Sequence, residues 1–293
     1  MQPVWMQPAQ IVYGMPPQQQ PPPQQQQQQW GQAPQMGGMM PQMGMPTMMP
    51  TPQPMMCAPP QPESWLAVAS RGQWAQLDGK LACVSVGNDG AIWGTTADGA
   101  IFRRMPGQPW QSVPGSLVQV SCTSFDRAVG VNGGMMIFEW DGREWRHIPG
   151  GATWVSEGRD GAVFCCNPNG NAFRLNADRQ NWTQLGGAGI TQISVGDAEH
   201  VAAIAAGLAF RFTPHNNDWA RIQSEGGLSR IAISAGGQRI VALAGGRALA
   251  FDGAASWTQV LAPPQLASIG VAAGGIVGAT GASDIFFLQL PRM

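Results

Sequence analysis

Apolar and polar positions alternate along the chain in a pattern that repeats every 35 to 38 residues. Each repeat opens with a tryptophan, has an aliphatic residue three positions later, and usually continues through a glycine-rich turn. Three short apolar segments follow, which in the first repeat are CVSVG (83–87), AIWGTT (91–96) and AIFRR (100–104). The pattern predicts six structural units of short strands, which open at Trp74, Trp110, Trp145, Trp182, Trp219 and Trp257.

Each unit is predicted to form a four-stranded antiparallel sheet, because turns of Gly, Asp, Asn and Pro separate its strands. One such sheet cannot bury both faces, but six sheets around an axis can, and closing the ring removes their exposed edges. We therefore predict an all-β fold, a six-bladed β-propeller over residues 65–293. The small VSVG-type strands suit the axis, where backbones converge. The six tryptophans suit the outer rim, where we predict a structural role for them.

The two ends of the repeat region predict how the ring closes. The last unit, with ASIGVAA (267–273), IVGAT (276–280) and IFFLQL (285–290), has no tryptophan strand after it. The strand at Trp74 comes before the first complete unit and has no blade of its own. We predict that this strand completes the last blade and joins the two ends of the ring. Trp65 lies outside the period and receives no role.

The N-terminal segment has a different composition. Its first 62 residues contain no charged side chain, but they hold 12 of the 16 Met and 16 of the 25 Pro. Proline every few residues breaks helices and strands, and no period organises the methionines. We predict a disordered low-complexity tail over residues 1–64. Its composition fits a self-associating segment and a solvated tether equally.

Charge and cysteine content limit the partners and the compartment. The formal net charge of −1 favours neither nucleic acid nor an anionic membrane as a partner. No apolar run reaches the roughly 18 residues that span a bilayer, and we expect no signal peptide. We expect a cytoplasmic protein, or one that reaches the cell surface without a signal peptide. An odd set of cysteines without a CxxC pair indicates a reduced compartment, and its members are Cys57, Cys83, Cys122, Cys165 and Cys166.

The sequence lacks the motifs of catalysis and of metal binding. Its three histidines include no His-x-x-x-His pair, and no cysteines have the spacing of metal ligands. It has no phosphate-binding glycine loop ahead of a helix and no G-x-S-x-G motif. We predict no enzyme activity, no catalytic residue, no cofactor and no metal. Calcium binding remains an alternative only at an Asp-containing loop such as GNDG (87–90).

The units WAQLDGKLACVSVGNDGAIWGTTADGAIFRR (74–104) and WTQLGGAGITQISVG (182–196) resemble the tectonin repeat. That repeat has a tryptophan, an aliphatic residue three positions on, a glycine, and strands of the I-S-V-G, V-W-G and I-Y-R type. The resemblance covers residues 74 to 293 and is weakest in the fifth and sixth units. It implies a six-bladed propeller that binds rather than catalyses. Several tectonin-like proteins are lectins for foreign glycans or bacterial lipopolysaccharide, and others are intracellular modules of membrane traffic and autophagy.

Antiparallel blades place the loops after their first and third strands on one face of the ring, which we name the polar face. These loops hold 17 charged residues, against six in the loops of the opposite face. Acids and amides orient sugar hydroxyls, so the polar face is the candidate ligand face, although the loops also fit simple solvated turns. The candidates are Asn88, Asp89, Asp126, Trp140, Asp141, Arg143, Arg159, Asp160, Asp197, His200 and His215.

Trp140 is the candidate aromatic platform, because it departs from the repeat period and flanks a tight Asp-Gly turn. Its ring suits the apolar face of a sugar, and it equally suits packing across the strands against Trp145. Two functions follow from these observations. The first is lectin-like recognition of glycans or lipopolysaccharide by the polar face. The alternative is an intracellular scaffold that binds a protein partner, with a self-associating tail.

Overall fold

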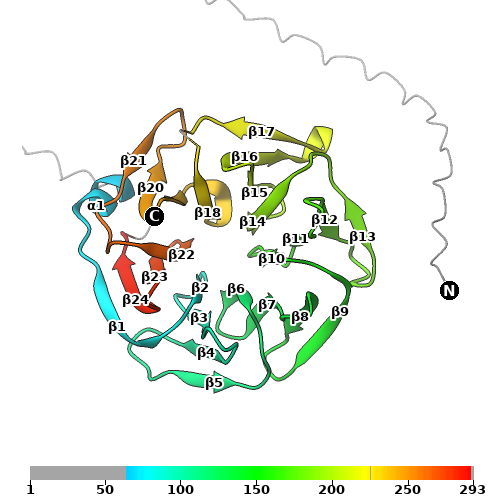
Figure 1. Cartoon of the computed structure of the whole chain (residues 1–293), viewed down its shortest axis with the longest axis horizontal. Helices are drawn as coiled ribbons and strands as arrows, with labels where there is room; N and C mark the ends of the chain where they lie inside the picture. The colour runs from blue at the N-terminus through cyan, green and yellow to red at the C-terminus, as the bar shows by residue number, and fades with distance from the viewer. Residues whose placement is uncertain (1–63, 225, 292–293) are drawn as a thin grey trace, which may run out of the picture. The chain divides into compact units, whose positions relative to one another are not determined.

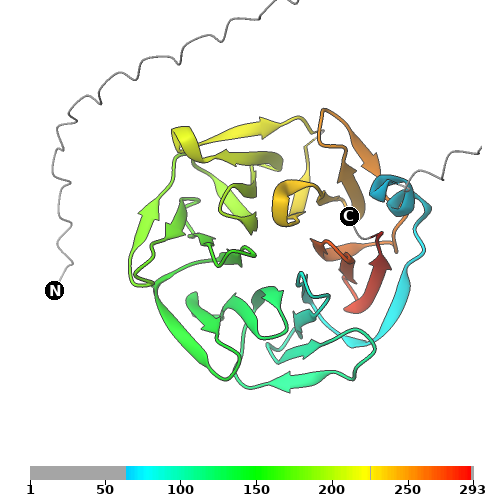
Figure 2. The ribbon, with the colours of Figure 1, turned by 180° about the vertical axis from the view of Figure 1, so that it is seen from behind.

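The structure, a computed structural model, describes residues 64–224 and 226–291. Except for Ser64, the predicted tail lies outside the described residues, as does Cys57. The described strands form six sheets arranged in a ring, which Figures 1 and 2 show from its two sides. Each sheet has four strands, paired antiparallel, so the prediction of a six-bladed propeller is confirmed.

We number the sheets as blades I to VI in chain order. Blade I consists of β2 (Cys83–Val86), β3 (Ile92–Thr95), β4 (Ile101–Arg104) and β5 (Gln111–Val113). Blade II consists of β6 (Gln119–Ser124), β7 (Arg127–Val131), β8 (Met136–Trp140) and β9 (Trp145–Gly151). Blade III consists of β10 (Trp154–Glu157), β11 (Val163–Cys166), β12 (Ala172–Leu175) and β13 (Trp182–Gln184). Blade IV consists of β14 (Ile190–Asp197), β15 (His200–Ala205), β16 (Leu208–Thr213) and β17 (Asp218–Ile222). Blade V consists of β18 (Leu228–Ile233), β19 (Ile240–Ala244), β20 (Arg247–Phe251) and β21 (Trp257–Gln259). Blade VI consists of β22 (Leu266–Ala272), β23 (Gly275–Thr280), β24 (Asp284–Gln289) and β1 (Ala75–Lys80).

The first strand of each blade lies nearest the axis (Figure 1), and in three blades a central serine of this strand joins it to the next blade. The hydroxyls of Ser85, Ser156 and Ser194 each accept a backbone N–H from the inner strand of the following blade, at 3.0 Å. Neighbouring blades share no ladder, so the hydroxyl satisfies an N–H that would otherwise lack an acceptor. The channel that these strands enclose has a volume of about 60 Å³, enough for water but not for a sugar.

The six tryptophans join each blade to the one before it. Every indole is partly buried, and its Nε1–H donates to a backbone carbonyl of the preceding blade at 2.6 to 2.9 Å. Glycine lies under several of the rings. A Cβ on Gly187, which has a φ of +81°, would lie 2.8 Å from the ring of Trp219. The recurring tryptophan and glycine of the sequence pattern are therefore two halves of one contact between blades.

Strand β1 closes the ring, as the unpaired tryptophan strand predicts. It pairs with β24 in the register Ala75↔Phe287 and Leu77↔Ile285, which places the start of the described chain in the last blade. Just before β1, helix α1 (Trp65–Arg71) begins at the N-cap residue Ser64, whose hydroxyl accepts the N–H of Ala67.

Trp65, which the sequence pattern leaves unexplained, packs through α1 against the core that blades V and VI share. The fully buried Arg239 lies 5.9 Å from its ring centroid and donates hydrogen bonds to the carbonyls of Ala272, Ala273 and Pro291. At this boundary alanine, Ala232, occupies the position of the joining serine. Arg239 and α1 therefore hold blades V and VI together by other contacts.

Candidate ligand-binding grooves on the polar face

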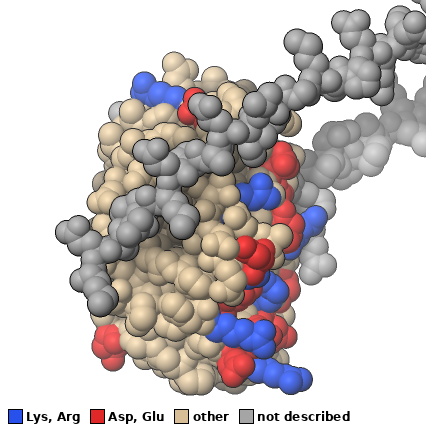
Figure 3. Space-filling model, turned by 90° about the vertical axis from the view of Figure 1, so that its right-hand side faces the viewer, with Lys and Arg blue, Asp and Glu red and all other residues tan. Residues whose placement is uncertain are grey.

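Charged side chains gather along one side of the ring in the edge-on view of Figure 3, with few elsewhere on the visible surface. Loops after first and third strands meet on the polar face. Arg127, which follows the loop after β6, and Arg179, in the loop after β12, both form ion pairs with Glu139. The two faces are not fully separate, because Asp78, one of the six charged residues predicted for the opposite face, lies 2.6 Å from Arg104.

Three candidate aspartates join neighbouring blades. Asp89, Asp160 and Asp197 occupy the turns that follow inner strands, and one oxygen of each accepts backbone N–H groups of its own turn. The second oxygen accepts a backbone N–H from the equivalent turn of the next blade, at 2.8 to 2.9 Å. Both oxygens thus have partners within the protein, so these residues have a structural reason to be present without a ligand.

Other candidates also have partners within the protein. Asp126 forms an ion pair with Arg103 at 3.3 Å, and the side-chain amide of Asn88 donates to a carbonyl of blade II at 3.5 Å. Asp141 accepts the N–H groups of Glu144 and Arg143, which lower the pKa of its carboxyl. Its second oxygen lies 2.7 Å from a guanidinium nitrogen of Arg146.

The two candidate histidines differ. His200 Nδ1 lies 2.7 Å from Asp197 Oδ1. Partial burial raises the pKa of Asp197, but the N–H of Gly236 and the His200 ring outweigh it, and the pKa is lowered. His215, Arg143 and Arg159 are exposed, and their side chains form no hydrogen bond or ion pair with any residue that the structure describes. These three stay candidates for a ligand.

Trp140 lies in the core between two other tryptophans. Only 4% of its surface is exposed, and its ring centroid lies 6.1 Å from that of Trp93 and 5.3 Å from that of Trp145. It sits opposite Trp145 in the β8–β9 register. A ring so enclosed offers no face to a sugar, so the structure favours cross-strand packing over the predicted aromatic platform.

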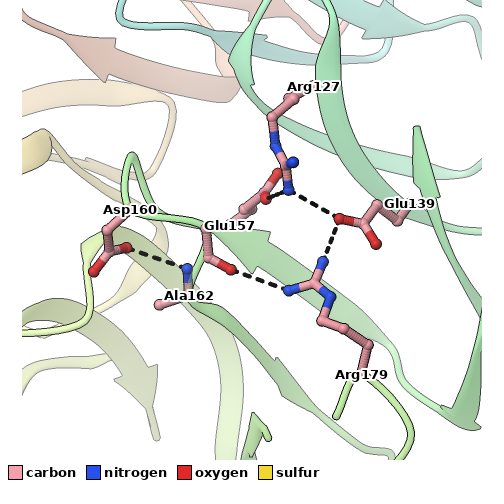
Figure 4. A network of polar contacts seen from close by, with 7 residues as sticks. Arg127, Glu139, Glu157, Asp160, Ala162 and Arg179 are labelled. Atoms are coloured by element: carbon pink, nitrogen blue, oxygen red, sulfur yellow. Dashed lines mark hydrogen bonds and ion pairs between the residues drawn. The ribbon is translucent and has the colours of Figure 1, made fainter. Parts of the chain in front are cut away.

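Four charged residues close the boundary between blades II and III, and Figure 4 shows them pointing toward one another. Arg127 lies 2.9 Å from Glu139 and 2.5 Å from Glu157, and Arg179 also pairs with Glu139. The Glu157 side chain is completely buried, and its Oε2 has no hydrogen-bond partner among the described residues. Burial raises the pKa of this carboxyl, although the bond from Arg127 opposes the rise.

Other boundaries remain open as grooves. Between blades III and IV lies a groove of about 610 Å³, whose lining includes Asp160, Arg174, Asn176, Thr183 and Asn217. Between blades IV and V lies a groove of about 520 Å³, lined by Arg211, Ala220, Arg221, Ile222, Gln223, Phe251, Gly253 and Ala254. A third, between blades VI and I, has a volume of about 510 Å³ and includes the candidates Asn88 and Asp89.

The first two grooves are built from equivalent positions. In blade III, Leu175 pairs with Trp182, and Arg174 immediately precedes Leu175. In blade IV, Phe212 pairs with Trp219, and Arg211 immediately precedes Phe212. The bottom of the first groove is lined by Phe212 of blade IV, and that of the second by Phe251 of blade V. Each phenylalanine pairs with the tryptophan of its own blade, and they are 4% and 6% exposed. Each groove therefore combines an apolar bottom with polar walls, and each presents an arginine without an acidic partner among the described residues.

The described residues contain no group of three or more His, Cys, Asp or Glu side chains that could hold a metal ion. In the same part of the chain, no helix has the length and apolar character needed to cross a bilayer. Cys83, Cys122, Cys165 and Cys166 are free and buried. Burial raises the pKa of Cys122 to about 12 and that of Cys166 to about 11, so these thiols stay protonated at neutral pH.

A sequence model of the tectonin domain matches residues 67–184, the segment that contains the sharpest repeats. This segment is therefore similar to the tectonin domain, and two curated tectonins match the chain as well. Tectonin-2 and Tectonin-1 of Physarum polycephalum are 39% identical over 67 residues and 37% identical over 73 residues. These matches cover 22% and 25% of this chain, but only 19% and 33% of the two relatives. The chain thus matches about a fifth and a third of their lengths.

Solved structures share this propeller fold at low identity. A gluconolactonase of Xanthomonas campestris has a TM-score of 0.60 and 14% identity, over 80% of this chain and 96% of its own. YCF48 of Cyanidioschyzon merolae has a TM-score of 0.53 and 13% identity, over 74% of this chain and 98% of its own. Such identities show the propeller fold alone and carry no activity to this chain.

The groove arginines are functional candidates that reasoning from loops missed, because they lie within strands. A signal for them exists in the third strands of the repeats. Arginine recurs at one position in AFRL (172–175) and LAFRF (208–212), where IFEW (137–140) has glutamate. Their freedom from acidic partners could not be read from this pattern, since it depends on which side chains meet across a boundary.

Proposed function

We propose that this tectonin propeller is a non-catalytic, lectin-like protein that binds glycans or bacterial lipopolysaccharide through its polar face. The observation that carries the proposal is the pair of equivalent grooves between blades III and IV and between blades IV and V. Repeated shallow sites gain avidity on a multivalent glycan surface, even when each site binds weakly.

The chemistry of the groove walls supports a saccharide ligand. In the groove between blades III and IV, the hydroxyl of Thr183 donates to Asn176 Oδ1 at 2.7 Å, which leaves the amide N–H groups of Asn176 free to donate. Amide, hydroxyl and guanidinium groups together form the donors and acceptors that sugar hydroxyls require. The buried Phe212 supplies an apolar base beneath them.

A glycan array and a lipopolysaccharide pull-down with the full chain test the proposal. We expect binding that falls when Asn176→Ala and Thr183→Ala remove polar groups of the groove wall. Lys80→Ala, on the opposite face, is the matched control and should bind as the natural protein does. Folded protein that binds nothing on a broad array would contradict the proposal.

A second candidate function, a scaffold for a protein partner, is favoured by the face opposite the polar one. The large apolar side chains Val118, Met135 and Met136 are 44% to 56% exposed there, the first two in loops with few charges and the third at the start of β8. Exposed apolar patches rimmed by polar residues mark protein interaction sites. Capture of a defined cytosolic protein that Met135→Glu abolishes, with glycan binding absent, would favour this function.

We also propose a reducing compartment for the protein. Four buried free thiols support it, since a small hydrophobic role for cysteine is typical of such compartments. Detection of the native protein on the surface of intact cells would contradict this proposal.

A further inference from the structure

The groove between blades IV and V differs from its neighbour in charge. Its lining residues include two arginines, Arg211 and Arg221, and no acidic side chain. The neighbouring groove, between blades III and IV, includes the carboxylate of Asp160. The nearest acidic residue along the chain, Asp252, accepts the backbone N–H groups of Ala254, Ala255 and Ser256. The Oδ1 atom of Asp252 is therefore engaged by its own turn.

Equivalent positions in other blades show how this chain neutralises a charge at this place. Arg103 corresponds to Arg211 in blade I, where it pairs with Asp126 and stacks 4.1 Å from the ring of Phe125. Glu139 corresponds to it in blade II and binds two arginines. Arg211 has neither kind of compensation among the described residues, and its Nε is buried without a hydrogen-bond partner.

We infer that this groove is selective for an acidic saccharide, with Arg211 and Arg221 binding the carboxylate, sulfate or phosphate group. The inference rests on the proposed function and specifies the ligand class at one of its sites. A guanidinium binds such oxyanions through paired, charge-assisted hydrogen bonds. The amide of Gln223 and the backbone at Gly253 and Ala254 line the same groove and offer further polar groups to the sugar.

Matched ligands test the inference on the full chain. Oligogalacturonate supplies carboxylates, its methyl ester supplies the same sugars without charge, and a heparin oligosaccharide and a mannose phosphate oligosaccharide supply the other two anions. We expect at least one acidic saccharide to bind about tenfold more tightly than its uncharged counterpart, because a charge-assisted contact has that magnitude. The preference should weaken at high salt.

Variants locate the effect. Arg211→Gln and the more exposed Arg221→Gln should each lower the affinity for the acidic saccharide about tenfold, and leave the affinity for the neutral ester unchanged. Arg247→Gln, which removes an exposed arginine at the start of β20 that does not line this groove, is the matched control. An equal loss in the control variant would overturn the inference, because the effect would then be one of net charge. Thermal unfolding of each variant verifies the fold, and Arg221→Gln decides the outcome if Arg211→Gln unfolds.

The remaining outcomes separate the inference from the proposed function. Binding of neutral and acidic saccharides with equal affinity leaves the lectin function standing and overturns the acidic preference. Binding of poly-glutamate as tight as that of the acidic saccharide also overturns it, in favour of an acidic protein partner. Failure of every saccharide to bind the folded protein overturns both.

Discussion

The boundary between blades II and III and the boundary between blades IV and V carry opposite charges at one equivalent position. Glu139 stands at the first and draws in Arg127 and Arg179, so the boundary is closed by ion pairs. Arg211 stands at the second, no acid reaches it from the described residues, and a groove remains. The same scaffold thus seals one boundary and leaves another open, according to whether the charge at this position meets partners of opposite sign. Predictions about stability and binding should therefore differ between the two.

The largest effect is expected at a tryptophan of the open boundary. The indole of Trp257 donates to the carbonyl of Gln223 at 2.7 Å and packs against Phe251. Trp257→Ala should lower the free energy of unfolding by about 3 kcal/mol, measured by urea denaturation. Trp257→Phe, which keeps the ring but loses the donor, should cost about 1 kcal/mol. If Trp257→Ala lowered the free energy of unfolding by less than about 1 kcal/mol, the indole would not hold the two blades together.

A smaller loss is expected at the sealed boundary when its buried acid is removed. Glu157→Ala deprives the partly exposed Arg127 of one partner and should lower the free energy of unfolding by about 2 kcal/mol. Glu144→Ala is the control, since Glu144 is exposed and lies 3.8 Å from Arg146. Its effect should stay within about 0.5 kcal/mol. Equal effects in the two variants would mean that the ion pairs do not seal this boundary.

The same carboxyl should make stability depend on pH. Burial raises the pKa of folded Glu157, so the folded state binds its proton more readily than the unfolded chain does. This contribution is fully present below the unfolded pKa and is lost as the pH rises through the folded pKa. The unfolding free energy of the natural protein, minus that of Glu157→Gln, should therefore increase as the pH falls from neutral toward the ordinary pKa of a glutamate. Asp197, whose pKa is lowered, acts in the opposite sense but cancels in the difference. A constant difference would refute the buried-acid assignment.

The smallest effect on stability is expected at the open boundary's arginine. Arg211→Gln should change the free energy of unfolding by less than about 0.5 kcal/mol, because no ion pair with a described residue is lost. Glu139→Gln, at the equivalent position of the sealed boundary, should cost more, since it weakens contacts to two arginines. Similar losses at both positions would erase the distinction between the boundaries.

The candidate site was predictable only in outline. The concentration of charge on one face follows from loop order, because antiparallel strands send alternate loops to opposite ends of a blade. The roles of Asp89, Asp160 and Asp197 did not follow, since their second partners lie 36 to 39 residues away in another blade. For the same reason Trp140 looked like a free platform, although Trp93, from the neighbouring blade, covers it.

The sequence alone determined the six-bladed ring, its closure by the strand after Trp74, and the placement of serine-bearing strands at the axis. These features follow from period, turn residues and side-chain size, which are local properties repeated six times. Only the tertiary structure decided which boundary closes and which stays open, and it gave Trp65 a place against blades V and VI. Charge compensation between blades depends on pairs of side chains distant in sequence, and no local pattern records which of them meet.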